Sequence, residues 1–179
     1  MSGSSSTQGF EGSRERIVIR EALSEDLLGI ARVYDPYAIS TSVTFDTAPM
    51  TDADRRDWLA RRDGGRDTVL VAISRGEVVG FAASGPFRPR AAYETSVETS
   101  VYVVAHSIGR GIGTALYEAL FRSLSNQEVH RAYAAISLPN PASVALHERF
   151  GFQHVGTLSE VGRKFARYWD VAWFERRMS

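Results

Sequence analysis

The sequence predicts a mixed α/β fold in which much of the sheet is antiparallel, and three observations lead to this class. Residues 96–103 alternate apolar with polar side chains, which is the period of a strand, whereas apolar residues across 112–124 recur at helical spacing. Three alternate glycines separate these segments, so a strand passes through a tight turn into a helix. Two apolar segments, 69–74 and 78–84, flank a short polar turn and predict a hairpin.

Before residue 69 the chain predicts one strand and two helices. Residues 17–20 alternate as a short strand, and Ser24 then begins a helix with acidic residues in its first turn. We expect Asp35-Pro36 to disturb or end that helix, because proline lacks an N–H and crowds the residue before it. A polar loop at 41–45 ends on an aromatic residue, and the Thr-Asp-Ala-Asp pattern at 51–54 predicts the start of the second helix.

After residue 124 the chain predicts three more strands and one more helix. Residues 132–136 form a short apolar strand, and residues 140–150 repeat apolar side chains at helical spacing before a glycine. Segments 152–158 and 168–174 are the final predicted strands, and we expect the polar segment 159–167 to be their connection.

Composition limits the classes of function. Lys plus Arg and Asp plus Glu both total 21, so the net charge is zero and nothing favours nonspecific nucleic-acid binding. Cysteine is absent, which excludes disulfides, thiolate metal sites and a cysteine nucleophile. No apolar run approaches the roughly 20 residues of a membrane helix. Residues 1–15 predict a flexible tail and residues 16–179 a single domain, and a cytoplasmic protein without membrane or metal is the simplest interpretation.

The glycine turn at Gly109, Gly111 and Gly113 is a candidate phosphate site. Glycines let an anion approach bare N–H groups, and the following helix start adds unsatisfied N–H donors and a positive dipole end. A Walker A loop is excluded because Thr114 follows where Lys is needed, and a dinucleotide site is excluded because Arg131 lies where an acidic residue is needed. A pyrophosphate cradle of the coenzyme A type and a plain tight turn both remain open.

Four segments occur in the order TSVTF, GPFRPRAAYETSVETSVYV, LPNPASVALHERFGF and VGRKFARYWDV. Together with residues 108–113, which lie in the register of the motif Q/R-x-x-G-x-G/A, they resemble the GNAT superfamily of acyl-CoA N-acyltransferases and, within it, the phosphinothricin N-acetyltransferase subfamily. Ile108 departs from the usual Gln or Arg. The resemblance implies a mostly antiparallel central sheet flanked by helices, acetyl-CoA as the acyl donor, a small-molecule amine as acceptor, and a homodimer.

Glu98 is the first candidate catalytic residue. By residue type alone, an exposed strand carboxylate or half of a salt bridge is the more common explanation. An amine must lose its proton before it attacks a thioester, and a partly desolvated carboxylate can accept that proton directly or through a water molecule. The segment ETSVYV matches one that carries the general base in the subfamily, and the resemblance therefore assigns that role to Glu98.

His147 is the second candidate catalytic residue. A lone histidine on a helix is more often a satisfied structural group than a catalyst. Many GNAT enzymes have a tyrosine in this register that serves as the acid toward the departing thiolate, and the subfamily has histidine there, as does HERFGF in this chain. The resemblance implies that His147 assists proton transfer at the reaction centre.

Arg88 and Arg90 flank a proline and predict a carboxylate clamp, because guanidinium groups bind carboxylates through paired hydrogen bonds. Either arginine alone would be explained as a solvated surface charge. The resemblance places basic residues of this loop at the carboxylate or phosphinate of the substrate. Tyr93 and Phe45 would then form walls, although aromatic residues are more often core, and Lys164 would lie near the substrate unless it is a surface charge.

The resemblance also implies a set of acetyl-CoA contacts. The pantetheine would lie along the strand that carries Glu98, with a backbone N–H polarising the thioester carbonyl. The pyrophosphate would lie on the glycine turn, where a neighbouring arginine can replace the side-chain donor that isoleucine lacks. The expected cofactor contacts are Val101, Tyr102, Val103, Ile108, Gly109, Arg110, Gly111, Ile112, Gly113, Thr114, Asn140 and Ser143.

Three functions remain open. The first is an N-acetyltransferase for the α-amine of a small free amino acid or analogue, such as phosphinothricin or methionine sulfoximine or sulfone. The second is an acetyltransferase for a protein N-terminus, a polyamine or an aminoglycoside, and the third is a CoA-sensing domain without catalysis. The arginine pair favours the first, since a cationic substrate prefers an acidic cleft. The presence of both Glu98 and His147 speaks against the third.

Overall fold

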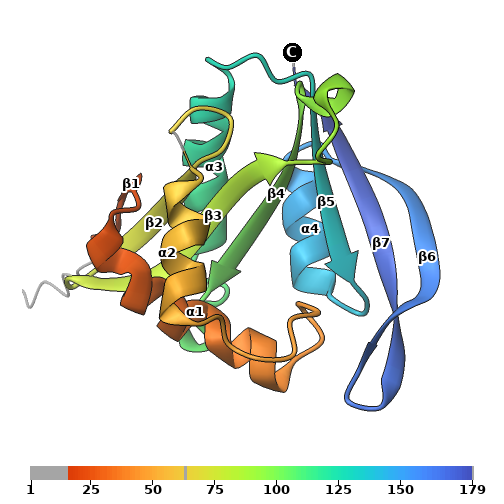
Figure 1. Cartoon of the computed structure of the whole chain (residues 1–179), viewed down its shortest axis with the longest axis horizontal. Helices are drawn as coiled ribbons and strands as arrows, with labels where there is room; N and C mark the ends of the chain where they lie inside the picture. Colours follow the sequence, from red (N-terminus) through yellow and green to blue (C-terminus); the bar gives the residue numbers. More distant parts are fainter. Residues whose placement is uncertain (1–15, 63, 179) are drawn as a thin grey trace, which may run out of the picture.

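The computed structural model describes residues 16–62 and 64–178, and the predicted tail, 1–15, lies outside them. Within the described residues, seven strands form one sheet in the order β1-β2-β3-β4-β5-β7-β6 (Figure 1). The predicted mixed α/β class with a mostly antiparallel sheet is confirmed, because β4 with β5 is the parallel pair and the other neighbours are antiparallel. In the described part of the chain, no helix is long and apolar enough to cross a membrane.

The first half of the sheet is an antiparallel unit of β1 (Val18–Glu21), β2 (Val69–Ser74), β3 (Glu77–Pro86) and β4 (Ser96–Val103). The predicted hairpin is confirmed, and Arg75 and Gly76 both have positive φ in its two-residue turn, the conformation that matches the twist of paired strands.

The second half of the sheet contains β5 (Arg131–Ser137), β7 (Arg167–Arg177) and β6 (Gln153–Lys164). Within the described residues, β4 and β5 pair only over Ser96–Glu98 with Arg131–Tyr133. Beyond Glu98 and Tyr133 the two strands separate, as Figure 1 shows, so the sheet is joined at one end and divided at the other.

Helices cover both faces of the sheet. α1 (Leu27–Ser40) and α2 (Asp52–Ala60) cover one face, whereas α3 (Ile112–Leu124) and α4 (Pro141–Arg149) cover the other (Figure 1). Two apolar clusters result: Val71, Phe81 and Ala83 face α1, and the alternate residues of the same strands face α3. Because successive side chains of a strand point to opposite faces, this alternation determines which residues of β4 share a face.

Of the two outcomes expected at Asp35-Pro36, an end of the first helix was wrong, because α1 continues through Pro36 to Ser40. The last turn is held by tertiary contacts: Ala38 is fully buried, and the Tyr37 hydroxyl donates to the Val103 carbonyl at 2.5 Å. These contacts outweigh the local cost of a proline whose own side chain is exposed.

The expectation that 159–167 is only a connection was also wrong. β6 runs to Lys164 and pairs with β7 as far as Arg167. The ladder is interrupted between Leu158 and Gly162, where Glu160 has positive φ and its N–H donates to the Asp170 carboxylate at 2.7 Å. The extension is polar because most of its side chains are exposed, and so hydrophobic alternation could not reveal it.

Candidate active site

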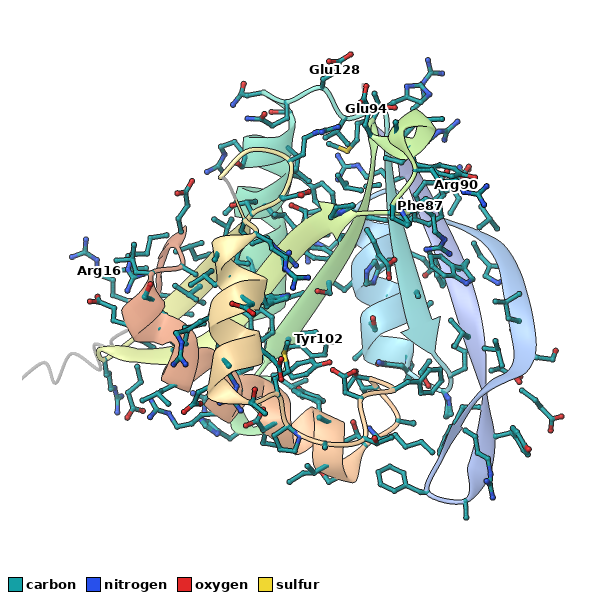
Figure 2. The ribbon with its side chains drawn as sticks, in the orientation of Figure 1. Arg16, Phe87, Arg90, Glu94, Tyr102 and Glu128 are labelled. Atoms are coloured by element: carbon teal, nitrogen blue, oxygen red, sulfur yellow. The ribbon has the colours of Figure 1, made fainter. Side chains whose placement is uncertain are left out.

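The separation of β4 from β5 leaves part of the β4 backbone without a neighbouring strand. The Val104 N–H donates to the Val79 carbonyl, so β4 residues with even numbers direct their backbone groups to β3. The N–H groups of Val101 and Val103 therefore point to the side that β5 has left. This is the geometry expected if an extended ligand lies along β4, and these two residues were predicted to contact pantetheine. Tyr102, predicted beside them, lies toward the divided end of the sheet (Figure 2).

The glycine turn leads directly into α3. Gly109 and Gly111 have φ of 82° and 80°, and a Cβ on either would have no described atom within 4 Å. Among the described residues, no side chain caps α3, whose first N–H groups have no helical carbonyl partner. Open space, bare N–H groups and a positive helix end together fit a pyrophosphate. The predicted neighbours Ile108 and Arg110 are exposed, and Thr114 lies in the first turn of α3.

Gly113 allows the glycine turn to lie close to α4, which begins with the predicted cofactor contacts Asn140 and Ser143. A Cβ on Gly113 would lie 3.4 Å from the Leu146 side chain, so glycine allows α3 to approach α4. Ile112, another predicted cofactor contact, is buried in the apolar core between α3 and the sheet. Asn140 caps α4, since its Oδ1 accepts from the Ser143 N–H at 3.1 Å, and its side chain is therefore partly occupied by a structural role.

His147 is buried, with 3% of its surface exposed, on the α3 and α4 side of the sheet. Its Nδ1 lies 2.7 Å from the Ser143 carbonyl oxygen, and because a carbonyl only accepts, we assign the ring proton to Nδ1. Its Nε2 lies 2.9 Å from the Tyr117 hydroxyl, which then donates to it. Burial lowers the pKa of His147, an effect opposed by the Ser143 carbonyl, and so the neutral ring is favoured.

Glu98 lies on the opposite face from His147, on the side of Ser100 and Tyr102. Burial raises the pKa of the Glu98 carboxyl above its ordinary value, and the nearby Arg88 guanidinium acts in the opposite direction. Arg88 Nη1 lies 3.9 Å from Glu98 Oε2, with 47% and 40% of the two side chains exposed. The structure thus brings these two predicted residues together at a position that solvent can reach.

An aromatic cluster that sequence reasoning missed holds Arg88. The guanidinium carbon lies 4.3 Å from the centre of the Phe87 ring and 5.4 Å from that of Trp173. Phe87 in turn stacks on Tyr133 at 4.2 Å, and Arg88 Nη1 donates to the Phe87 carbonyl at 2.7 Å. Tyr133 is the register partner of Glu98, so the cluster lies where β4 and β5 last pair. The sequence signal was weak, because these aromatics come from three distant segments.

Arg90 and Tyr93 line a pocket of about 260 Å³ beside Glu98, and Arg66, Arg88 and Glu94 line the same pocket. Figure 2 shows Arg90 beyond Phe87, near the end at which β4 and β5 meet. Arg88 and Arg90 thus lie in one pocket, Arg88 also approaches Glu98, and the carboxylate clamp predicted from Arg-Pro-Arg stays a prediction.

Phe45 and Lys164 connect the loop after α1 to β6. A Cβ at Gly162 would collide with the Phe45 ring, so this ring lies directly against the β6 backbone. Lys164 is 5% exposed, and its Nζ donates to the Thr44 carbonyl at 2.7 Å. Burial lowers the pKa of Lys164. Both residues are engaged with the chain itself, and their predicted contacts with substrate stay predictions.

The arrangement places a carboxyl group, a guanidinium group and two backbone N–H groups beside the gap that opens where β4 and β5 separate. A carboxylate with raised pKa can accept a proton from an amine, and backbone N–H groups can polarise a carbonyl. Within residues 16–62 and 64–178, no group of three or more His, Asp or Glu is placed to hold a metal ion.

Comparison with known proteins gives the family. Residues 19–173 match the family described as Acetyltransferase (GNAT) domain. The chain is 50% identical over 163 residues to a phosphinothricin N-acetyltransferase of Streptomyces coelicolor, covering 89% of this chain and 95% of that protein. It is 36% identical over 158 residues to the L-methionine sulfoximine/L-methionine sulfone acetyltransferase of Pseudomonas aeruginosa, covering 88% of this chain and 92% of that protein.

A solved structure agrees with these relatives. The phosphinothricin acetyltransferase of Sinorhizobium meliloti, in complex with AcCoA, has a TM-score of 0.87 and 30% identity to this chain, covering 91% of this chain and 89% of that one. The resemblance drawn from the motifs is confirmed. The chain is an N-acetyltransferase and belongs to the GNAT acetyltransferase domain family.

Proposed function

We propose that the protein transfers an acetyl group from acetyl-CoA to the α-amine of a small free amino acid or analogue, with Glu98 as the general base. The proposal depends on one observation, the 3.9 Å approach of Arg88 Nη1 to Glu98 Oε2. In an α-amino acid the amine and the carboxylate are bonded to the same carbon atom. A carboxylate bound to Arg88 therefore brings its amine to Glu98.

The residues around the gap have separate roles in this proposal. The turn at Gly109 and Gly111 and the start of α3 bind the pyrophosphate through N–H groups, and β4 binds the pantetheine through Val101 and Val103. When bound, acetyl-CoA supplies an activated acetyl thioester and leaves as the thiol. Glu98 accepts the proton that the ammonium must lose before its nitrogen can bond to the acetyl carbon.

For His147 we propose that the neutral ring assists proton transfer at the reaction centre by accepting at Nε2, where the Tyr117 hydroxyl is its neighbour. Neutral His147 carries its ring proton on Nδ1, where the Ser143 carbonyl holds it, and its Nε2 accepts from the Tyr117 hydroxyl. A proton exchanged at Nε2 therefore passes through Tyr117 or requires that this hydrogen bond break.

A small acceptor with a carboxylate is favoured over a polyamine or an aminoglycoside. Arg88 adjoins Glu98, and three guanidinium groups line the next pocket against two carboxylates, so a cationic acceptor would approach a lining with an excess of positive charge. Relatives named for phosphinothricin and for methionine sulfoximine or sulfone support the same class of acceptor.

The test is a substrate profile measured by release of CoA thiol. We expect turnover of phosphinothricin, methionine sulfoximine and methionine sulfone, and weak turnover of the corresponding amines without a carboxylate. Arg88→Gln should raise KM for the carboxylated acceptors by about tenfold or more, since hydrogen bonds to charged groups are the strong ones.

Arg122→Gln is the matched control, because it removes an exposed guanidinium of α3, the helix that covers the face of the sheet opposite to Glu98. A profile without any α-amino acid, or an equal effect of Arg88→Gln on acceptors with and without a carboxylate, would contradict the proposal.

A further inference from the structure

The helix α2 lies across β3, the strand that pairs with β4 (Figure 1). Trp58 of α2 meets Phe81 of β3 edge-on, with the ring centres 6.2 Å apart. Four residues after Trp58, the Arg62 guanidinium lies over Gly85 of β3. An added Cβ at Gly85 would be 3.5 Å from Arg62 Nη2 and 3.7 Å from the guanidinium carbon. Glycine therefore lets this guanidinium lie directly on the strand.

This position adjoins the candidate base, because Gly85 is the register partner of Glu98. Phe81 and Gly85 share the face that packs against α1, and Glu98 on the neighbouring strand points to the same face. Cβ atoms of directly opposite residues lie about 5.5 Å apart. The Arg62 guanidinium carbon is therefore at most about 9 Å from Glu98 Cβ. Arg88 is thus not the sole guanidinium near the Glu98 carboxyl.

The Arg62 guanidinium is partly removed from water without an ion pair to balance it. Its carbon lies 4.9 Å from the centre of the Trp58 ring, and burial lowers the pKa of Arg62 against the favourable charge of Asp67. Among the described residues, no carboxylate forms an ion pair with Arg62, and its enclosed Nε has no hydrogen-bond partner. The side chain still reaches solvent, since it lines a pocket of about 400 Å³ with Thr68 and Val69. A stacked guanidinium of this kind can bind a ligand through its terminal Nη groups.

We propose that Arg62 is a specificity-determining residue that binds oxygen atoms at the end of the acceptor's side chain. The inference rests on the proposed function, in which Arg88 binds the α-carboxylate and Glu98 accepts the proton of the amine. The side chain leaves the same carbon atom as these two groups, and four bonds of such a chain span roughly 5 Å. A side chain that runs from Glu98 across β3 therefore ends beside Arg62. Two oxygen atoms on one centre match the paired N–H donors of a guanidinium.

Methionine sulfone and methionine form a matched pair for the test, since they differ only in two oxygen atoms on sulfur. Both offer the same α-carboxylate and amine, so the ratio of their kcat/KM values reports the end of the side chain alone. We expect the wild type to favour the sulfone by about tenfold or more, the ratio typical of a hydrogen bond to a charged group. The ratio is measured on one preparation, so it does not depend on how much of the protein is folded.

Arg62→Met should bring this ratio to about one, because methionine keeps the apolar packing against Trp58 and has no N–H donor. Arg62→Lys keeps a cation but loses the paired donors, so its ratio should lie between those of the wild type and Arg62→Met. Arg88→Gln should weaken both substrates alike and leave the ratio unchanged, because the α-carboxylate is common to both. Arg61→Met is the control, since it removes the neighbouring exposed guanidinium and should also leave the ratio unchanged.

The outcomes separate this inference from the proposed function. A wild-type ratio near one, a ratio that Arg62→Met does not lower, or an equal loss in Arg61→Met would overturn the role of Arg62 and leave the proposed function standing. A ratio for Arg62→Lys no higher than that for Arg62→Met would do the same, since the contact would then not depend on a cation. Turnover of no α-amino acid in the profile above would overturn the proposed function and this inference with it.

Discussion

Glu98 is under two opposing influences at the scale of a single residue. Burial disfavours its ionised form, and Arg88 at 3.9 Å favours it. Burial is the larger influence, so the carboxyl keeps its proton to a higher pH in the folded chain than in the unfolded chain. A carboxylate destabilised in this way is a stronger base toward an ammonium group than an exposed glutamate.

Glu98→Gln should therefore change activity and stability in different directions. Turnover should fall by a factor of about 10² to 10⁴, the typical contribution of a general base, with acetyl-CoA binding retained. The raised pKa of Glu98 gives stability that is present below the ordinary value of 4.5 and lost as pH rises through the folded value. Thermal unfolding of Glu98→Gln should thus improve relative to the wild type between pH 4 and neutral pH.

Glu77→Gln, at the exposed start of β3, is the control for both measurements. Unchanged turnover in Glu98→Gln would remove this residue from the mechanism, and a melting difference independent of pH would contradict the assignment of its raised pKa.

The sequence predicted the candidate residues themselves better than the side chains that contact them. Glu98 and Arg88 lie ten residues apart in one motif, and their approach is local enough to be anticipated. Tyr117 is fully buried and lies thirty residues before His147, to which its hydroxyl donates. Nothing in the pattern of α3 distinguishes this tyrosine from an ordinary core residue, because its function depends on the packing of two helices.

At the scale of elements, the strand, turn and helix around Gly111 were the most predictable part of the chain. The period changes from two to 3.6, and the helix that the sequence predicts at 112–124 is found as α3, Ile112–Leu124. By contrast, the helical turn after Pro36 and the extended end of β6 depend on contacts with distant residues. Local signals identified the first kind of element and missed the second.

Gly111→Ala tests whether the turn is a binding element or only a bend. Alanine at φ near 80° should cost about 1 kcal/mol of the free energy of unfolding, because left-handed backbone is unfavourable for residues with a Cβ. The new methyl group would also enter the open space in front of the α3 N-terminus. We therefore expect the KM for acetyl-CoA to rise severalfold, measured in the thiol assay.

Gly76→Ala is a matched control, because Gly76 has φ of 81° and equally open surroundings in the β2–β3 turn, far from the gap. Both variants should lose similar stability, and Gly111→Ala alone should weaken acetyl-CoA binding. Equal KM values in the two variants would identify the turn as a bend without a ligand.

At the scale of the whole molecule, the loop after α1 and the strand β6 form a long-range contact beside the site. The Phe45 ring packs against Gly162, and Lys164 Nζ donates a hydrogen bond to the Thr44 carbonyl. The resemblance predicted that these segments lie near the substrate, but composition could not show that they touch. The homodimer also stays a prediction, and β6 and β7 expose large apolar side chains at Val155, Leu158, Val161 and Tyr168.

Gly162→Ala should disturb this contact. Its methyl group collides with the Phe45 ring, so the loop must move away from β6. We expect the KM for the acceptor amine to rise and amide hydrogen exchange across 41–46 to accelerate, with the KM for acetyl-CoA unchanged. Gly156→Ala, in the same strand with no described atom within 4 Å of its added Cβ, should do neither. Similar behaviour of the two variants would show that the loop position does not matter.

The short junction of the sheet has a mechanical consequence. The two halves of the sheet, β1–β4 and β5–β7, are hydrogen-bonded to each other only over Ser96–Glu98 and Arg131–Tyr133. Beyond these residues no strand pairing in the described chain connects the two halves. Their spacing is set instead by side chains of the covering helices, where Leu146 closes on Gly113 and the Phe150 ring meets Tyr117 at 5.5 Å. The distance between β4 and β5 beyond their paired residues therefore depends on the volumes of a few apolar side chains. It can change without any change in the backbone hydrogen bonds within either half of the sheet.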